Sequence, residues 1–233
     1  MVDFHTHILS GMDDGSQSIE ESVQMLEQMR EQGIRAVAAT SHFDMRQETL
    51  EHFLMRREKA MEELNRANTS GITILPGAEV LYCGVSLHRY ENLEQACIGT
   101  SRYLLIENLF PEWTKEFQSD LEYLMIERNI IPVLAHVERY YYIRKNRSII
   151  RNLSQEGVVL QVNAETLLNK KTSRRAWKIL QKETVGLIGS DCHNLSVRPP
   201  NLADAAEKMK KVLGTEKTSQ FFTRANTMLQ ESV

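Results

Sequence analysis

Seven short apolar segments alternate with amphipathic segments of helical periodicity along this chain, and this alternation limits its fold more than any other feature. Parallel strands need a crossover between them, and a helical crossover that packs back onto the sheet is right-handed. The chain is therefore expected to form either a barrel or an open, doubly wound α/β sheet. Strands are predicted at residues 2–8, 34–40, 72–75, 102–106, 130–135, 158–163 and 185–189, and helices at 18–33, 47–68, 116–129, 144–156, 172–183, 201–213 and 216–230, with one or two short helices in 85–96.

The carboxyl ends of the predicted strands decide between these two folds. Six of the seven ends carry His, Asp or Glu, and five of the seven histidines lie there. In an open sheet such ends spread along an edge, whereas in a barrel they surround one mouth, where barrel enzymes place their chemistry. We therefore predict a barrel whose mouth carries His5, His7, His42, Glu79, Glu107, His136, Asp191 and His193.

The first strand shows the pattern most simply. Side chains alternate between the faces of a strand, so Asp3, His5 and His7 are expected to point the same way. Two imidazoles on one face can converge on a metal ion, although the H-x-H motif alone is a weak signal. Asp3 either orients an imidazole or makes a buried structural hydrogen bond. Asn163, at the end of the one strand without a charged residue, is given no role.

Composition and charge narrow the class of protein. The 233 residues are 42% hydrophobic and 25% charged, with no linker or repeat, which predicts a single domain over 1–233. The net charge of −3 offers no general attraction to nucleic acid or to an acidic membrane. No segment has transmembrane length, and Cys83, Cys97 and Cys192 suggest neither a disulfide framework nor a zinc site. We expect a cytoplasmic protein with neither a nucleic-acid partner nor membrane insertion.

The residues at the predicted mouth are suited to metal ions. Imidazoles and carboxylates without thiolates favour Mn, Zn or Fe(II). Four protein ligands saturate a tetrahedral site, so eight or nine such groups imply two or three ions, with a carboxylate such as Glu79 between neighbours. A hydroxide held between two ions is a strong nucleophile at neutral pH, and the ions also neutralise phosphoryl oxygens.

Seven ordered segments together resemble the polymerase-and-histidinol-phosphatase (PHP) superfamily, and more narrowly the bacterial tyrosine-protein phosphatases of capsule and exopolysaccharide operons. The similarity runs from residue 1 to about residue 200. The segments that carry it are His5-Thr-His7, Asp13-Asp-Gly15, Thr40-Ser-His42, Gly77-Ala-Glu79, Leu105-Ile-Glu107, Ala135-His136-Val-Glu-Arg139-Tyr140 and Ser190-Asp-Cys-His193-Asn-Leu-Ser-Val-Arg198-Pro-Pro.

This resemblance implies a distorted (β/α)7 barrel of the PHP type with a site for three metal ions, Mn²⁺ first, with Fe or Zn as alternatives. It implies that Arg139 and Arg198 bind phosphate, and arginine is suited to this because its planar fork holds two oxygens at once. An ion pair with a neighbour such as Glu138 is the alternative for Arg139. Transferred by position, the implied ligands are His5, His7, Glu79 and Asp191 for the first ion, Glu79, Glu107 and His136 for the second, and Asp14, His42 and His193 for the third, with Asp13 able to replace Asp14.

The resemblance also implies a function. The expected activity is metal-dependent hydrolysis of phosphotyrosine on a protein, with an autophosphorylating bacterial tyrosine kinase that controls polysaccharide synthesis as the partner. Another PHP phosphoesterase, such as histidinol-phosphatase, is the alternative. Phe43, Phe110, Trp113 and Tyr140 are expected on loops at the mouth, where they either flank a substrate ring or pack in the core.

Three other classes of protein share part of this pattern. Cys192 to Arg198 has the C-x5-R spacing of cysteine-dependent tyrosine phosphatases, but it lacks phosphate-binding glycines, and Pro199-Pro200 prevents a helix from following directly. Metal-dependent amidohydrolases also begin with H-x-H, yet they use a modified lysine or further histidines in place of Glu79 and Glu107. A metal-bound scaffold without activity is the remaining alternative, and the large ligand set argues against it.

Overall fold

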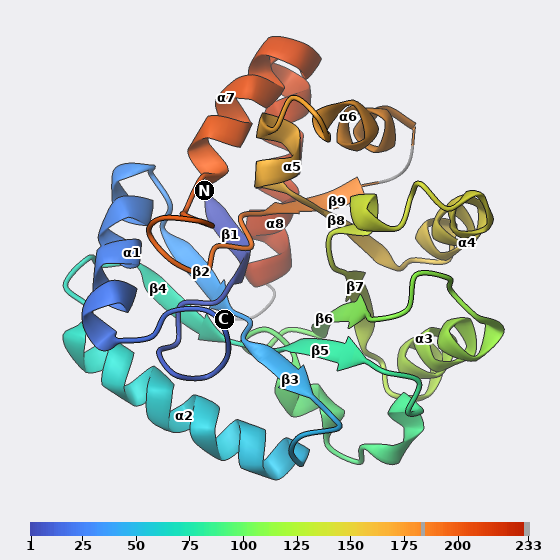
Figure 1. Cartoon of the computed structure of the whole chain (residues 1–233), viewed down its shortest axis with the longest axis horizontal. Helices are drawn as coiled ribbons and strands as arrows, with labels where there is room; N and C mark the ends of the chain where they lie inside the picture. The colour runs from blue at the N-terminus through green and yellow to red at the C-terminus, as the bar shows by residue number, and fades with distance from the viewer. Residues whose placement is uncertain (183–184, 231–233) are drawn as a thin grey trace.

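The computed structural model describes residues 1–182 and 185–230. The predicted alternation of strands and helices is confirmed along this part of the chain (Figure 1), while Glu183, the predicted end of one helix, lies outside it. The strands are β1 Val2–Thr6, β2 Ala36–Ala39, β3 His42–Asp44, β4 Thr73–Pro76, β5 Glu79–Tyr82, β6 Tyr103–Asn108, β7 Ile131–Leu134, β8 Val159–Asn163 and β9 Val185–Gly189. The α-helices are α1 Ile19–Glu31, α2 Leu50–Ala67, α3 Lys115–Glu127, α4 Arg144–Gln155, α5 Ala164–Leu168, α6 Ser173–Lys182, α7 Leu202–Leu213 and α8 Thr215–Gln230, and short 3-10 turns are η1 Leu87–Arg89, η2 Leu93–Ala96 and η3 Val137–Arg139.

The strands form two parallel sheets that together make a distorted barrel. One sheet has the order β1-β2-β4 and the other the order β3-β5-β6-β7-β8-β9. The ring is not closed by one continuous ladder, but β1 meets the segment after β9 through the parallel bridge between Thr6 and Cys192. The backbone N–H of Asp191 donates to the carbonyl of His5 at 2.8 Å. The predicted α/β class and distorted barrel are thus confirmed.

The second and third predicted strands are each followed by a two-residue break and a further short strand, which sequence periodicity did not indicate. Residues 40–41 separate β2 from β3, and residues 77–78 separate β4 from β5. Gly77 sits where an added Cβ would lie 3.1 Å from Ile98, so a larger residue there would crowd the core. After both breaks the strands pair again with His42 opposite Glu79. The two interruptions therefore bring an imidazole and a carboxylate to the same level of the barrel.

A buried arginine supports one of these breaks from outside the barrel. Arg57 on α2 is only 8% exposed, and its guanidinium donates to the carbonyls of Gly77, at 3.3 Å, and Gln95, at 2.9 Å. Buried carbonyls that leave a strand ladder need such partners. Arg57 therefore stabilises the chain two residues before Glu79.

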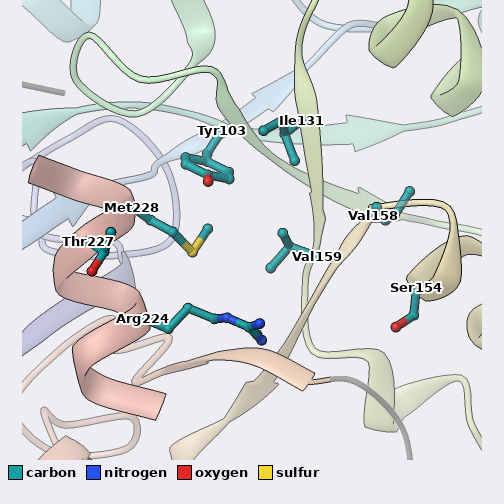
Figure 2. Close-up of a pocket in the computed structure, with 10 residues that line it drawn as sticks. Tyr103, Ile131, Ser154, Val158, Val159, Arg224, Thr227 and Met228 are labelled. Atoms are coloured by element: carbon teal, nitrogen blue, oxygen red, sulfur yellow. The ribbon is translucent and has the colours of Figure 1, made fainter. Parts of the chain in front are cut away.

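The two ends of the barrel differ in chemistry. At the amino ends of the strands, α8 packs against β1 and β9, and its Ala225 and Met228 join an apolar cluster with strand residues such as Phe4 and Leu187. A cavity of about 380 Å³ lies there between α8 and the first residues of β6, β7 and β8 (Figure 2). The polar residues gather at the opposite, carboxyl end. None of the described helices is both long enough and apolar enough to cross a membrane.

Candidate metal centre

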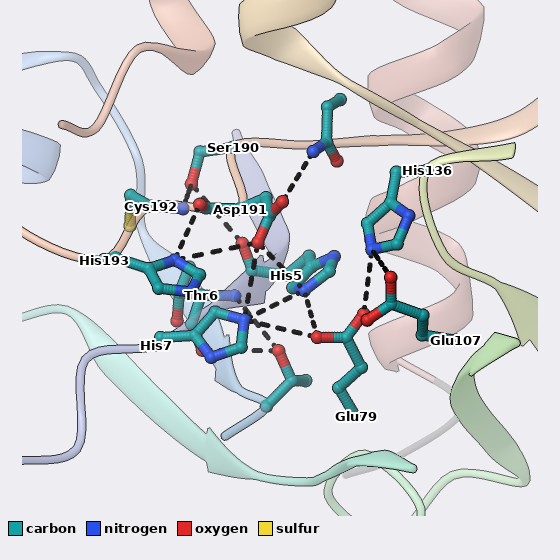
Figure 3. Close-up of polar contacts among 12 residues, drawn as sticks. His5, Thr6, His7, Glu79, Glu107, His136, Ser190, Asp191, Cys192 and His193 are labelled. Carbon is teal, nitrogen blue, oxygen red and sulfur yellow. Dashed lines mark hydrogen bonds and ion pairs between the residues drawn. The ribbon is translucent and has the colours of Figure 1, made fainter. Parts of the chain in front are cut away.

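The predicted mouth residues converge in the structure (Figure 3). Each comes from the carboxyl end of a strand or from the first residues of β3 and β5 after the interruptions. The backbone is left-handed at two of them, since His136 and Asp191 have positive φ angles of 33° and 55°. Such left-handed backbone is costly for residues other than glycine and is found mostly where function requires it.

The most buried group contains two imidazoles and two carboxylates. His5 Nε2 lies 3.1 Å from His7 Nε2, 3.1 Å from Glu79 Oε2 and 3.3 Å from Asp191 Oδ1. His7 Nε2 lies 3.4 Å from the same two carboxylate oxygens. Ligand atoms that share one ion at bonds of about 2.1 Å are themselves about 3.0 to 3.4 Å apart. The four side chains are therefore spaced as ligands of a single ion are.

A second group shares Glu79 with the first. His136 Nε2 lies 3.1 Å from Glu79 Oε1 and 3.5 Å from Glu107 Oε1. The two oxygens of Glu79 thus face two different groups, as a bridging carboxylate requires. His42 approaches the same carboxylate from another side, with its Nδ1 3.1 Å from Glu79 Oε2.

The third group separates the roles of two neighbouring aspartates. Asp14 Oδ1 lies 3.5 Å from His42 Nε2 and 3.4 Å from His193 Nε2, and its side chain is 69% exposed. Asp13 instead accepts hydrogen bonds from the backbone N–H of His42 at 2.7 Å and of Gly15 at 2.9 Å, and its carboxylate contacts His7 Nδ1 at 2.8 Å. Asp14 therefore lies among the candidate ligand atoms of His42 and His193, while Asp13 contacts the Nδ1 atom of His7.

Burial and charge oppose each other in this cluster. Burial would raise the pKa of Glu79, but the imidazoles of His5, His136 and His42 hold it well below its usual range. The pKa of His193 falls to about 4 because of burial and the nearby positive charges of His7 and Arg198. His193 is therefore a neutral imidazole at pH 7, which is the form that binds metal.

Two amides on β8 orient the candidate ligands. Asn163 Nδ2 donates to Asp191 Oδ2 at 2.6 Å, and Gln161 Nε2 donates to Asn163 Oδ1 at 2.8 Å. Gln161 Oε1 accepts from the backbone N–H of His136 at 2.7 Å and lies 3.3 Å from His5 Nδ1. The sequence interpretation gave Asn163 no role and did not consider Gln161, although their i, i+2 spacing on a buried strand repeats the spacing of His5 and His7. Such outer partners fix the tautomer and direction of ligands.

Asp3 does not contact the imidazoles. Its Oδ1 accepts from the backbone N–H groups of His5 and Ser190, at 3.3 Å and 3.0 Å. Desolvation raises the pKa of this fully buried carboxyl to about 6. Of the two alternatives for Asp3, the structure supports the buried structural hydrogen bond, which ties β1 to the end of β9.

The two predicted phosphate-binding arginines point at one carboxylate oxygen from two directions. Asp191 Oδ2 lies 3.0 Å from Arg139 Nη2 and 2.5 Å from Arg198 Nη2. Arg139 also lies 3.4 Å from Glu107, whereas Glu138 accepts from the hydroxyl of Thr166 at 2.9 Å. The ion pairs of Arg139 thus involve candidate metal ligands rather than Glu138. Both guanidiniums are partly exposed, so an anion entering the mouth can reach them.

Three of the four mouth aromatics are packing residues. Phe43 and Trp113 are at most 1% exposed, and Tyr140 is 8% exposed with its hydroxyl donating to the Asn108 carbonyl at 2.6 Å. Phe110 alone of these four is exposed, at 44%. Only Phe110 therefore remains available to contact a substrate ring.

Comparison with known proteins assigns the chain to a family. Residues 1–230 match the family model for capsular polysaccharide synthesis, CpsB/CapC. The chain belongs to the CpsB/CapC family. The tyrosine-protein phosphatase CpsB of Streptococcus pneumoniae is 32% identical over 95% of both chains, and the tyrosine-protein phosphatase YwqE of Bacillus subtilis is 27% identical over 99% of this chain and 92% of its own.

Solved structures agree on the fold. A structure of the metal-dependent tyrosine phosphatases YwqE from Bacillus subtilis and CpsB from Streptococcus pneumoniae matches with a TM-score of 0.86 at 24% identity, covering 100% of this chain and 96% of that one. A histidinol phosphate phosphatase from Lactococcus lactis, in complex with zinc, L-histidinol and phosphate, matches with a TM-score of 0.56 at 17% identity, covering 93% of each chain. The predicted resemblance to capsule-type tyrosine-protein phosphatases is therefore confirmed by the family model and the relatives, and the solved structures share the fold.

The cysteine of the C-x5-R spacing does not suit nucleophilic chemistry in this CpsB/CapC protein. Cys192 is completely buried, and burial raises the pKa of its thiol well above the usual range. A reactive cysteine needs a thiolate and access to its substrate. The next helix, α7, begins only at Leu202, so its positive end does not follow the cysteine.

We predict that Cys192 is inert toward alkylation in the folded protein. Iodoacetamide at pH 7.5 should modify the partly exposed Cys83 first, and Cys192 should react only after unfolding in urea. Peptide mass spectrometry over a time course measures both rates in the same sample, so Cys83 is the internal control. Modification of Cys192 as fast as Cys83 would contradict the interpretation of a buried thiol.

Proposed function

We propose that this chain is a metal-dependent protein-tyrosine phosphatase that hydrolyses phosphotyrosine. The observation that supports it most is the placement of two arginines, Arg139 and Arg198, directly over a buried cluster of imidazoles and carboxylates at one barrel mouth. Membership of the CpsB/CapC family, whose relatives in the comparison are tyrosine-protein phosphatases, supports the same activity.

We propose three metal ions, with Mn²⁺ as the native metal and Fe or Zn as possible substitutes. The donors are imidazole nitrogens and carboxylate oxygens, which all three metals accept. The spacing of ligand atoms described above supports this assignment, as does the approach of both Glu79 oxygens to different groups. The proposed ligands are His5, His7, Glu79 and Asp191 for the first ion, Glu79, Glu107 and His136 for the second, and Asp14, His42 and His193 for the third.

The chemistry then divides between the ions and the side chains. Bound ions at such a site supply Lewis acidity that activates water and polarises a phosphoryl group. The guanidiniums of Arg139 and Arg198 bind the remaining phosphoryl oxygens and stabilise the charge that develops on them. Asn163 keeps one oxygen of Asp191 occupied, so that its other oxygen faces His5 and His7. Asp13 holds His7 through Nδ1 and leaves Nε2 directed into the cluster.

An aryl phosphate suits this arrangement. The phenolate of tyrosine leaves with a pKa of about 10, so its departure depends little on a general acid. Phe110 is exposed beside Gly84, where an aromatic ring on a protein chain can reach it. We further propose that the substrate is an autophosphorylating bacterial tyrosine kinase that controls capsular or exopolysaccharide synthesis, and that the protein acts in the cytoplasm as a single domain.

We predict that a phosphotyrosine peptide is hydrolysed much faster than a phosphoserine peptide or histidinol phosphate. The reason is the better leaving group and the ring contact, and the measurement is kcat/KM for the three substrates on one Mn²⁺-loaded preparation. Cys192→Ser should keep most activity, whereas Asp191→Asn should lose nearly all of it. A clear preference for histidinol phosphate would support histidinol-phosphatase instead, and an inactive Cys192→Ser enzyme with its metals bound would support thiol chemistry.

We predict that Arg139→Ala and Arg198→Ala each lower kcat/KM toward a phosphotyrosine peptide. The expected decrease corresponds to a loss of about 2 to 4 kcal/mol of transition-state stabilisation. Each change removes a charged contact to the phosphoryl group while leaving the proposed ligands in place. Metal content should be unchanged, which mass spectrometry of the purified variants tests. Arg66→Ala, on the exposed surface of α2, is the matched control and should have no effect. Wild-type kinetics in both arginine variants would contradict their role.

A further inference from the structure

The segment that begins at Arg139 is strongly basic. Residues 139–182 contain 11 Lys and Arg but only 2 Asp and Glu, a net charge of +9 in a chain whose total is −3. The segment runs from η3 through α4, β8 and α5 to α6. We define as the basic flank five exposed residues at the start of α4 and around the first turn of α6: Arg144, Lys170, Lys171, Arg174 and Arg175. Lys145, also exposed at the start of α4, is left out because it pairs with Glu112 at 3.6 Å.

The basic flank adjoins the proposed phosphate site. α6 packs against η3, the turn that carries Arg139, and the Arg175 guanidinium lies 5.7 Å from the centre of the Tyr142 ring. Arg147 Nε donates to the carbonyl of Tyr141 at 2.8 Å, which fixes the start of α4 to the loop after η3. These contacts hold the flank next to Arg139.

Helix stability does not explain the position of these charges. Basic residues near a helix N-terminus are unfavourable because the helix dipole is positive there. Among the α-helices of the described residues, α4 and α6 are the two without an acidic residue in the first turn, whereas α1 has Glu20 and Glu21 and α2 has Glu51. The flank therefore gathers positive charge against the local preference of the backbone.

The other side of the mouth has the opposite charge. A pocket of about 390 Å³ lies there beside His42. The charged side chains that line it are the four carboxylates of Asp13, Asp14, Asp44 and Glu48 and the guanidinium of Arg56. These residues belong to the loop after β1 and to the region between β3 and α2, and α2 lies across the barrel from α6 in Figure 1. On this side Arg46 pairs with Asp44 at 2.7 Å and Arg56 pairs with Glu48 at 2.8 Å. This side therefore offers an anionic chain no excess of positive charge, whereas the basic flank does.

We propose that the basic flank binds anionic side chains of the substrate next to its phosphotyrosine, so that the enzyme prefers acidic phosphopeptides. This proposal rests on the proposed function, because it assumes that Arg139 holds the phosphoryl group. A peptide chain that leaves this group toward η3 passes over α6 and the start of α4. Carboxylates or a second phosphate group supply the same anionic chemistry. The contacts are remote from the reacting phosphate, so they lower KM and leave kcat unchanged.

The test compares three phosphotyrosine peptides of equal length. In these peptides the residues next to the phosphotyrosine are Gln, Glu or a second phosphotyrosine. For the wild type, we expect kcat/KM to be about tenfold higher with Glu than with Gln, since three exposed ion pairs each contribute a small factor. The preference should shrink as salt is added, because exposed charges are screened. If kcat/KM rises more with the second phosphotyrosine than with Glu, the basic flank prefers phosphate as its anionic ligand. If both peptides raise kcat/KM equally, the flank accepts either anion.

The variant Arg144→Ala/Lys171→Ala/Arg174→Ala should lose this preference through KM and still turn over p-nitrophenyl phosphate at the wild-type rate. The control variant Lys59→Ala/Lys211→Ala/Lys217→Ala removes three exposed charges from α2, α7 and α8 and should keep the preference.

Equal kcat/KM for the Gln and Glu peptides in the wild type would overturn the proposal, as would equal losses in both variants. If the flank variant loses only binding to phosphatidylserine vesicles and keeps the peptide preference, the basic flank binds a membrane surface instead. That result would also overturn the proposal. Failure of the wild type to hydrolyse any of the phosphotyrosine peptides would instead contradict the proposed function.

Discussion

The buried carboxylate of Glu79 is the group on which the arrangement of the mouth depends. Its oxygens lie 3.1 to 3.4 Å from ring nitrogens of four imidazoles, those of His5, His7, His42 and His136. An ionised carboxylate that is fully buried is costly unless positive charge lies close to it. The imidazoles provide that charge only when they are protonated, whereas metal ions held between them and the carboxylate provide it when the imidazoles are neutral. The proposed ions thus offset the free-energy cost of burying Glu79 and Asp191 together.

Two local features of the barrel bring residues of this cluster together. The break between β4 and β5 places Glu79 at the first position of a new strand, opposite His42. Gly189 allows β9 to approach β1 closely, because an added Cβ would lie only 2.7 Å from the Cβ of His5. This approach brings Asp191 beside His5. A regular closed barrel with larger residues at these positions would hold the same ligands farther apart.

Periodicity and strand ends were sufficient to predict the main alternation of strands and helices and the convergence of eight polar residues at one mouth, but β3, β5 and the short helix α5 were not predicted as separate elements. Two kinds of feature were not predictable. The interruptions at Thr40-Ser41 and Gly77-Ala78 depend on tertiary packing, which local pattern does not contain. The roles of Gln161 and Asn163 were missed because neutral amides rarely bind metals and become informative only when their partners are known. The choice between Asp13 and Asp14 likewise needed the conformation of the turn, and the burial of Phe43, Trp113 and Tyr140 needed the core.

The central claim is that the mouth binds several metal ions that share Glu79. The most direct measurement is the metal content of purified, Mn²⁺-reconstituted protein by inductively coupled plasma mass spectrometry, compared with Glu79→Gln and Asp14→Ala. The account predicts more than one ion per chain in the wild type, a loss of more than one ion in Glu79→Gln, and a loss of at most one in Asp14→Ala. One ion or none in the wild type, or unchanged content in Glu79→Gln, would contradict it.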